Sequence, residues 1–209
     1  MIAFAPALLV KAPHLRVVDD PARKGAGDAD WVEGARRGDP GAEEAIYRAY
    51  APAVLTLTTR LLGRRADAED ATQDTFLIAF TKLAQLRDAS ALRPWLMCIA
   101  VSQARRRFRR RRLLSALGLS IGADDATLES LVAPGVSAEA RVDLAVLDRI
   151  LGTLPANHRI AWMLRYVEGE PLDAVARACG CSLATAKRWI GSADTQVRAE
   201  VRLGEIEEP

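Results

Sequence analysis

The chain has 209 residues and a formal net charge of +2, and 50% of its residues are hydrophobic, which is enough to form a packed core. Ala, Leu and Arg are frequent and favour helix, whereas the β-branched runs typical of strands are nearly absent. So small a positive charge argues against a protein that only grips duplex DNA, because such proteins are more basic overall. We therefore expect an all-helical protein that contacts nucleic acid with one face and another protein with a second face.

The cysteines and the N-terminal stretch exclude further classes of protein. Three scattered cysteines do not suit a disulfide framework, and Cys179 and Cys181 lack the C-x-x-C spacing of a metal site. Pro6 interrupts the apolar stretch at the N-terminus and no basic stretch precedes it, so this stretch fits neither a signal peptide nor a membrane span. We expect a cytoplasmic protein with free thiols, no metal, no cofactor and no direct membrane insertion.

The first part of the chain is predicted to change from a leader into helices. Residues 1–29 are expected to form a flexible leader, because "DDPARKGAGDAD" combines Pro, Gly and mixed charge. A helical pattern begins at Trp31. The next helix is predicted to begin at Pro40, with Asp39 as its N-cap. Pro52 is expected to kink or divide that helix, because proline removes a backbone N–H donor.

The stretch "ADAEDATQDTFLIAFTKLAQL" predicts a further helix, with Asp67 as its N-cap and acids in its first turn, where the helix dipole favours them. It is expected to end near Leu86. Apolar residues at helical spacing mark a buried stripe, namely Ala71, Phe76, Leu77, Phe80, Leu83 and Ala84. A second face is shared by Asp70, Gln73, Asp74 and Leu77. By spacing alone, a solvated acidic surface explains this second face equally well.

A third segment, "RPWLMCIAVSQARRRFRRRRLL", is predicted to be one helix from Pro94 to Leu113. Its 20 residues would span about 30 Å. Seven arginines lie between Arg105 and Arg112. Their unbroken join to an apolar helix argues against a disordered basic tail and favours one wall of a nucleic-acid site, although the run by itself indicates only phosphate contact. The last arginines, 110–112, are expected to fray and to be merely solvated.

The second half of the chain begins with a change in composition. Residues 114–142 are rich in Ser, Gly and acids, which predicts a flexible linker. Helical patterns return over residues 143–203, and a short tail follows at 204–209. Within this part, Pro155 or Asn157 is expected to open a helix.

Two predicted helices, at 171–178 and 183–198, flank a tight turn at Gly180, which is the pattern of a helix-turn-helix. In such a unit the second helix enters the major groove and its first residues reach base edges. The candidates for DNA contact are Ser182, Thr185, Lys187 and Arg188, with Ser182 also serving as the N-cap. Trp189 and Ile190 suit packing against the domain. A helical hairpin that binds no DNA is the alternative on this pattern alone.

Together these segments resemble a bacterial sigma factor of the extracytoplasmic-function class, a minimal branch of the sigma-70 family. The resemblance covers residues 30–113 and 143–202. It rests on four stretches in the order of the family: "GDPGAEEAIYRAY", "DAEDATQDTFLIAF", "LRPWLMCIAVSQARRRFRRRR" and "LPANHRIAWMLRYVEGEPLDAVARACGCSLATAKRWI". It implies an all-α fold class with two small helical domains, residues 30–113 and 143–203, joined by a flexible linker, and the second domain a helix-turn-helix.

The resemblance also implies a function and partners. The chain would bind core RNA polymerase, at the β′ clamp and β subunits, and direct promoter recognition, opening and transcription initiation on promoter DNA. The family often has an anti-sigma factor as a further partner. No enzymatic chemistry of its own is implied, and no catalytic triad, metal set or Gly-rich phosphate loop is visible in the sequence.

Three sets of residues are implied by position. Polymerase binding would fall to Asp70, Gln73, Asp74 and Leu77. Contact with the −10 element would fall to Leu86, Arg87, Asp88, Ser102, Arg105, Arg106 and Arg109, because a basic wall follows the strand while a loop holds an unstacked base. Contact with the −35 element would fall to Ser182, Thr185, Lys187 and Arg188.

The sequence departs from the family at several of these places. Ser102 and Arg106 stand where Asn or Asp is frequent, so base preference at the −10 element does not carry over. Trp189, Ser192 and Asp194 replace frequent arginines of the recognition helix, and fewer phosphate contacts imply weaker and less salt-dependent binding of the −35 element. A stand-alone helix-turn-helix regulator that needs no polymerase is the alternative function, and it would bind duplex DNA, usually as a dimer.

Overall fold

The computed structural model describes residues 27–118, 146–147 and 149–206. For residues 201–206 it describes the backbone alone. Over these residues the chain is helical and contains no strand. It divides into two compact units, one containing residues 27–118 and the other residues 149–206. The expected all-helical fold with two helical domains is thereby confirmed. The predicted leader up to residue 26 and the predicted linker from residue 119 lie outside the described residues.

The first unit begins with α2, Asp28–Arg36, and α3, Pro40–Leu62. Helix α2 starts before Trp31, within the predicted leader, because two acids in its first turn complement the helix dipole. Helix α3 starts as predicted: Asp39 accepts a hydrogen bond from the backbone N–H of Gly41 at 2.9 Å and Pro40 is the first helical residue.

Pro52 does not divide α3, which is one helix of 23 residues. The predicted division is therefore wrong, while the alternative of a kink stays a prediction. Proline removes only one N–H donor from the helical ladder, and the buried side chains of Tyr50 and Val54 on either side hold the helix in the core. The helix ends at Gly63, whose φ of +64° is easily reached without a side chain.

Helix α4, Arg65–Lys82, is followed by two short 3₁₀ turns, η3, Leu83–Gln85, and η4, Ala89–Ala91. Its N-cap is Arg64, so the prediction that Asp67 caps the helix was wrong, and Asp67 lies in its first turn. The predicted burial is confirmed for Ala71, Phe76 and Leu83. It is wrong for Leu77 and Ala84, which are exposed. Leu77 was also assigned to the outer face of this helix, and that is where it lies.

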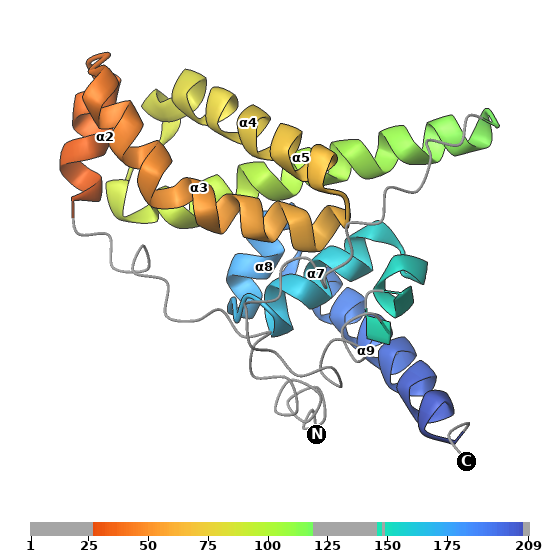
Figure 1. The fold of residues 1–209 in the computed structure, drawn as a ribbon. Helices are drawn as coiled ribbons and strands as arrows, with labels where there is room; N and C mark the ends of the chain where they lie inside the picture. Colours follow the sequence, from red (N-terminus) through yellow and green to blue (C-terminus); the bar gives the residue numbers. More distant parts are fainter. Residues whose placement is uncertain (1–26, 119–145, 148, 207–209) are drawn as a thin grey trace, which may run out of the picture. The chain divides into compact units, whose positions relative to one another are not determined.

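Helix α5, Leu92–Ala116, begins before Pro94 and continues past Leu113. Proline is tolerated in this first turn because the first N–H groups of a helix have no intrahelical partner. The helix passes through the whole arginine run without fraying, and Gly118 follows with a φ of +73°. Helices α3, α4 and α5 pack on one another and α2 packs on α3, while α5 extends beyond the ends of α3 and α4 (Figure 1).

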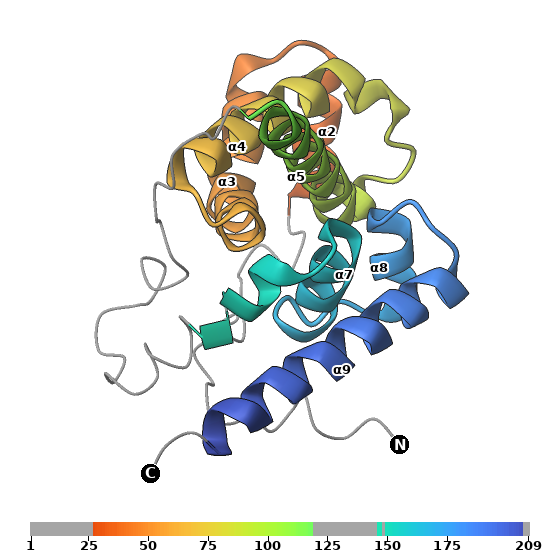
Figure 2. The same cartoon turned by 90° about the vertical axis from the view of Figure 1, so that its right-hand side faces the viewer.

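The second unit contains α7, Ala156–Tyr166, α8, Leu172–Ala178, and α9, Leu183–Ile206, preceded by helical residues at 149–153. Helix α9 packs against both α7 and α8 (Figure 2). The turn between α8 and α9 has the predicted geometry: Gly180 has a φ of +56°, and the Ser182 hydroxyl accepts a hydrogen bond from the backbone N–H of Thr185 at 3.2 Å.

The helix-turn-helix predicted from the sequence is therefore present, although α9 continues well beyond residue 198. Its core includes Ile160, Leu164, Val175 and Ala186, all of them fully buried. None of the described helices combines the length and hydropathy that crossing a membrane requires.

Candidate functional site

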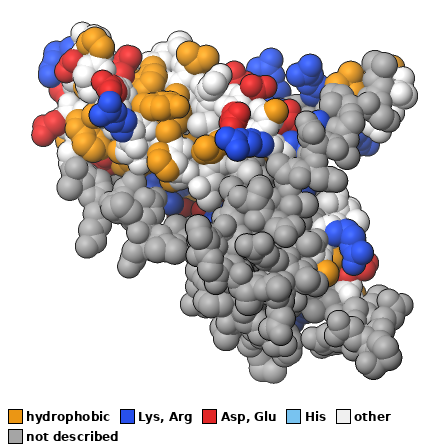
Figure 3. Space-filling view, viewed as in Figure 1, with side chains coloured by type: hydrophobic (Ala, Val, Ile, Leu, Met, Phe, Trp, Pro, Cys, Tyr) orange, Lys and Arg blue, Asp and Glu red, His pale blue; other side chains and the backbone are white. Residues whose placement is uncertain are grey.

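The outer face of α4 presents three of the four residues predicted to bind polymerase. Asp70, Gln73 and Leu77 are exposed and lie on successive turns of the helix. Leu77 is 67% exposed and adds an apolar side chain to this otherwise polar face. Hydrophobic and acidic side chains lie side by side over the α3 and α4 part of the surface (Figure 3). Such a face suits a protein partner that offers both an apolar contact and basic side chains.

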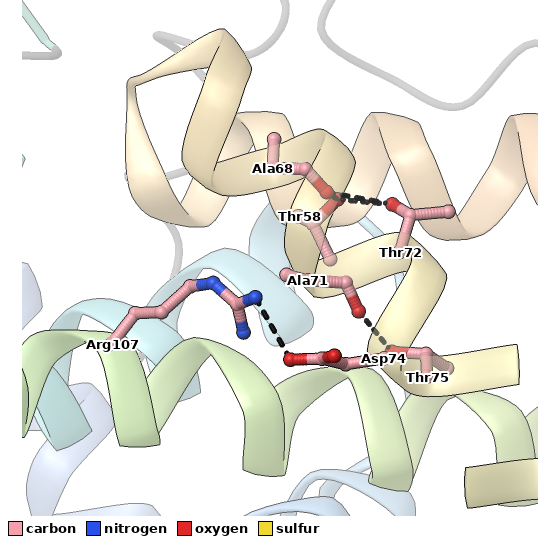
Figure 4. A network of polar contacts seen from close by, with 7 residues as sticks. All are labelled: Thr58, Ala68, Ala71, Thr72, Asp74, Thr75 and Arg107. Atoms are coloured by element: carbon pink, nitrogen blue, oxygen red, sulfur yellow. Dashed lines mark hydrogen bonds and ion pairs between the residues drawn. The ribbon is translucent and has the colours of Figure 1, made fainter. Parts of the chain in front are cut away.

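Asp74, the fourth predicted docking residue, is turned toward α5. Its carboxylate accepts a hydrogen bond from Arg107 Nη2 at 2.9 Å, and the Arg107 side chain is only 14% exposed (Figure 4). This pair joins α4 to α5 inside the unit. The two faces of α4 therefore differ: one is open to a partner and the other is occupied by the chain's own arginine.

A set of buried hydroxyl groups holds α4 to α3 on its remaining side. The Thr58 hydroxyl lies 3.0 Å from the Thr72 hydroxyl and 3.2 Å from the Ala68 carbonyl oxygen (Figure 4). The Thr72 hydroxyl donates to the same carbonyl at 2.8 Å. Buried polar groups that satisfy one another fix a packing arrangement more specifically than apolar contacts do. Helix α4 is thus fixed on two sides, and its outer face is held in place.

The arginines of the run on α5 point in different directions. Arg107 and Arg111, one helical turn apart, face α4. Arg111 forms an ion pair with Asp67 and donates to the Leu62 carbonyl at 3.0 Å, so it ties α5 to the end of α3 and the start of α4. The expectation that residues 110–112 are merely solvated was therefore wrong for Arg111, because its position on the helix places it opposite an acid.

The outward side of α5 carries most of the predicted −10 contacts. Ser102, Arg106 and Arg109 are exposed and recur at i, i+4 and i+7, which places them along one face. Arg105 is half-buried at the edge of this face. Beyond them, the exposed side chains include Arg110 and Arg112. A row of guanidinium groups on one side of a helix produces a strong positive field that attracts phosphates.

The turn between α4 and α5 contains the other three predicted −10 residues, and they are not equivalent. The Leu86 side chain is only 5% exposed, so it anchors the turn in the core and is not available to a nucleotide. Arg87 and Asp88 are exposed. The Asp88 carboxylate accepts hydrogen bonds from the Ser90 hydroxyl at 2.7 Å and backbone N–H at 2.9 Å, which lower the pKa of Asp88 below its ordinary value.

The predicted −35 residues lie at the start of α9. Ser182, Lys187 and Arg188 are exposed, while Thr185 is half-buried and its hydroxyl lies 2.9 Å from that of Ser182. The two hydroxyls are thus partly engaged in capping the helix. Lys187 and Arg188 are the charged candidates for DNA contact in these first turns.

Three other residues of α9 have structural roles. Ile190 is buried as predicted, and the half-buried Trp189 ring packs near the His158 ring with centroids 6.2 Å apart. Asp194, which replaces a frequent family arginine, is only 8% exposed and forms an ion pair with Arg198. Its carboxylate therefore points into the unit, where it does not repel a phosphate.

The internal role of four charged residues was not predicted from the sequence: Asp67, Asp74, Arg107 and Arg111. A signal was present, because the two acids are separated by two helical turns and the two arginines by one. Only the packing of α4 on α5 brings these stripes together, and spacing within each helix does not reveal that partnership.

The chain is similar to known protein families and known proteins. Residues 46–113 match sigma-70 region 2 and residues 144–193 match sigma-70 region 4. The RNA polymerase sigma-H factor of Pseudomonas aeruginosa is 27% identical over 169 residues, which are 78% of this chain and 88% of that protein. The ECF RNA polymerase sigma factor SigE of Mycolicibacterium smegmatis is 28% identical over 184 residues, which are 82% of this chain and 71% of that protein.

Solved structures share the fold. The sigma factor RpoE of Bartonella quintana, in complex with the anti-sigma factor NepR, has a TM-score of 0.59 at 24% identity and covers 76% of this chain and 96% of its own. CnrH, in complex with the cytosolic domain of CnrY, has a TM-score of 0.60 at 22% identity and covers 85% of this chain and 99% of its own. With both family regions matched in order by a chain of two helical units, the protein belongs to the sigma-70 family, as a sigma factor of the extracytoplasmic-function class.

Proposed function

We propose that this sigma factor binds core RNA polymerase through the outer face of α4 and reads a promoter with two surfaces. The first consists of α5 and the turn before it, at the −10 element, and the second is the start of α9, at the −35 element. In this proposal residues 30–113 form the region 2-like domain, residues 114–142 connect it, and residues 143–203 form the region 4-like domain. The protein carries no chemistry of its own and acts in the cytoplasm, with the polymerase.

The observation that supports this proposal most directly is the division of α4 and α5 into inner and outer faces. The inner faces are occupied by ion pairs such as Asp74–Arg107, while the outer faces offer acids with a leucine on α4 and arginines on α5. These two outer surfaces have opposite charge and suit different partners. A stand-alone helix-turn-helix regulator would not use the exposed face of α4 that contains Leu77, so that alternative is not favoured.

The test of the function is reconstitution with core polymerase. Purified protein added to core enzyme should initiate transcripts from a shared pair of −35 and −10 sequences upstream of their start sites, as mapped by sequencing the 5′ ends on a genomic template library. The protein alone should bind those promoters weakly. Tight, specific duplex binding without polymerase, together with no promoter-specific transcripts, would favour the stand-alone regulator instead.

The docking face is tested separately with paired variants. Asp70→Arg combined with Gln73→Ala should weaken binding to core polymerase by about tenfold or more, because it reverses the charge of this face and removes a polar contact. Asp74→Asn is the matched control: it removes an acid from the same helix but from the Arg107 pair, so it should lower thermal stability more than core affinity. Core affinity is measured by competition against a labelled sigma factor, and equal losses for both variants would contradict the assignment.

An anti-sigma protein is a further expected partner. The sigma factor RpoE of Bartonella quintana, which shares this fold, was solved in complex with the anti-sigma factor NepR. An inhibitor that competes with polymerase for the Leu77 face would fit the exposure of that side chain. Capture of the inhibitor should then be reduced by the same double variant that reduces core binding.

A further inference from the structure

Helix α2 lies against the turn between α4 and α5, at the end of the unit where the predicted base-holding loop is found (Figure 1). The contact includes a specific polar bond: the Arg36 guanidinium donates from Nη2 to the Leu86 carbonyl. These residues are far apart in the sequence, and Arg36 lies outside the stretch that matches sigma-70 region 2.

Arg36 extends from a helix that is itself fixed. At the other end of α2, the Tyr50 hydroxyl lies 2.7 Å and 2.8 Å from the two oxygens of the Asp28 carboxylate, and Asp28 is only 3% exposed. Along its length, α2 buries Val32 against the core. A Cβ atom added to Gly34 would lie 2.8 Å from the Ala42 Cβ, so α2 and α3 are in close contact there. A guanidinium on such a helix holds its acceptor at a set position.

The turn that receives this bond is held at two points. The first is Leu86, through its buried side chain and through its carbonyl, which accepts from Arg36. The second is the hydrogen-bonded turn that the Asp88 carboxylate forms with Ser90. Arg87 lies between these points, and both Arg87 and Asp88 are exposed.

We infer that Arg36 is a positioning residue for promoter reading, which fixes the backbone at Leu86 so that Arg87 and Asp88 meet one base of the −10 element in a set geometry. The inference rests on the proposed role of this turn at the −10 element. Arg36 acts through the backbone of the turn and does not itself touch DNA. A loosely held turn would still carry the same side chains but would discriminate poorly between bases, because discrimination depends on placement of the contacting groups.

Arg37 provides a matched control on the same helix end. Both arginines lie near Glu33, with Arg36 at 3.7 Å and Arg37 at 3.2 Å from its carboxylate oxygens. The Arg37 side chain is 68% exposed and that of Arg36 is 32% exposed. Replacing either by methionine removes the same charge from the same helical turn, while only the Arg36 variant loses the donor to Leu86.

The experiment compares full-length wild-type protein, Arg36→Met, Arg37→Met and Arg36→Lys, each assembled with core polymerase. Initiation is measured on a promoter set that carries each of the four bases at every −10 position. Arg36→Met should lower the preference for the best base over the others by roughly tenfold, the order expected for loss of a hydrogen bond from a charged donor. Arg37→Met should keep the wild-type preference, and Arg36→Lys should restore part of it because lysine retains a charged donor.

Core affinity and thermal unfolding of the same variants separate positioning from folding. Arg36→Met is expected to keep core affinity within twofold of wild type. If it instead slows initiation equally on all promoters and leaves base preference intact, Arg36 is merely structural and the inference is overturned. If it folds too poorly to assemble, Arg36→Lys decides: a base preference below that of wild type at wild-type core affinity supports the inference, and a wild-type base preference with slower initiation on all promoters overturns it.

A further variant, Arg87→Ala with Asp88→Ala, distinguishes failure of this inference from failure of the proposed function. If the double variant alters base preference but Arg36→Met does not, the turn reads the promoter without help from Arg36, and only this inference fails. If the double variant leaves base preference unchanged, the proposed role of the turn fails and the inference fails with it.

Discussion

Helices α5 and α9 both carry predicted DNA contacts, but they use their charged residues differently. Helix α5 has seven arginines between Arg105 and Arg112, of which Arg107 and Arg111 are bonded to acids of α4 and others face outward. At the start of α9, Lys187 and Arg188 are exposed, while Arg198 further along is paired with Asp194. The number of basic residues in a segment therefore does not measure its capacity to bind DNA, because the face of each residue decides its role.

This difference also gives the two surfaces unequal expected strength. A surface that neutralises more phosphates releases more counterions, so its binding is tighter at low salt and more sensitive to added salt. We expect α5 to provide the larger electrostatic share of promoter binding and α9 the smaller share. Three predictions test this comparison, and a fourth tests the packing of α9 on α7.

The largest expected effect is a loss of folding stability when the two inward arginines, Arg107 and Arg111, are replaced. Arg107→Ala combined with Arg111→Ala should lower the free energy of unfolding by about 1–3 kcal/mol, because the two substitutions leave two partly exposed carboxylates without their partners. Thermal or urea unfolding followed by circular dichroism measures this loss. Arg110→Ala with Arg112→Ala removes the same number of charges from exposed positions and should leave stability nearly unchanged. Equal destabilisation by both pairs would contradict the division of the helix.

The next largest effect is expected on promoter opening, when two outward arginines are replaced. Arg106→Ala with Arg109→Ala should leave unfolding unchanged but reduce promoter opening by about tenfold, as measured by fluorescence of a base analogue in the −10 strand. The slope of log affinity against log salt should become shallower by about 1.4, since each lost contact with a single strand removes about 0.7. If core binding falls more than opening does, the face has been assigned to the wrong partner.

A smaller effect is expected at α9. Lys187→Ala should reduce the dependence of initiation on the −35 sequence by only a few-fold, with a salt slope shallower by about 0.9 for one duplex phosphate. Arg198→Ala removes the same charge from the same helix but from the Asp194 pair. It should lower stability and leave the −35 dependence intact. A larger loss of promoter binding from Arg198→Ala would show that the far part of α9 contributes to DNA contact.

The smallest effect concerns His158, which packs near Trp189 of α9. Burial, with a contribution from the nearby positive charge of Arg188, lowers the pKa of His158 below its ordinary value. The unfolded chain therefore binds a proton more readily than the folded chain does. Stability should be fully present above the unfolded pKa of about 6.5 and should fall slightly as pH decreases through that range.

His158→Gln should remove this small pH dependence while leaving stability at pH 8 nearly unchanged, as measured by urea unfolding at pH 5.5 and pH 8. If the stability of the variant and of the wild type falls equally between pH 8 and pH 5.5, groups other than His158 cause the pH dependence. The contact between α7 and α9 would then have no part in the pH response.

Much of the fold was predictable because its signals are local. Asp39 with Pro40 marked the start of α3, and Gly180 with Ser182 marked the turn of the helix-turn-helix. The errors were made where tertiary contacts override local preference. Pro52 remains inside a helix whose neighbouring side chains are buried, and Asp67 lies in the first turn of α4, where it pairs with Arg111.

The sequence by itself determined the periodicity of the helices, the caps and turns, the arginine run and the resemblance to sigma factors, because these depend on residues near one another in the chain. Tertiary structure alone decided which arginines face inward, which side of α4 is open, and that Leu86 is buried with its carbonyl bonded to Arg36. The physical reason is that a helix fixes which residues share a face but not what that face meets. Partners such as Asp74 and Arg107 are brought together only when α4 packs on α5.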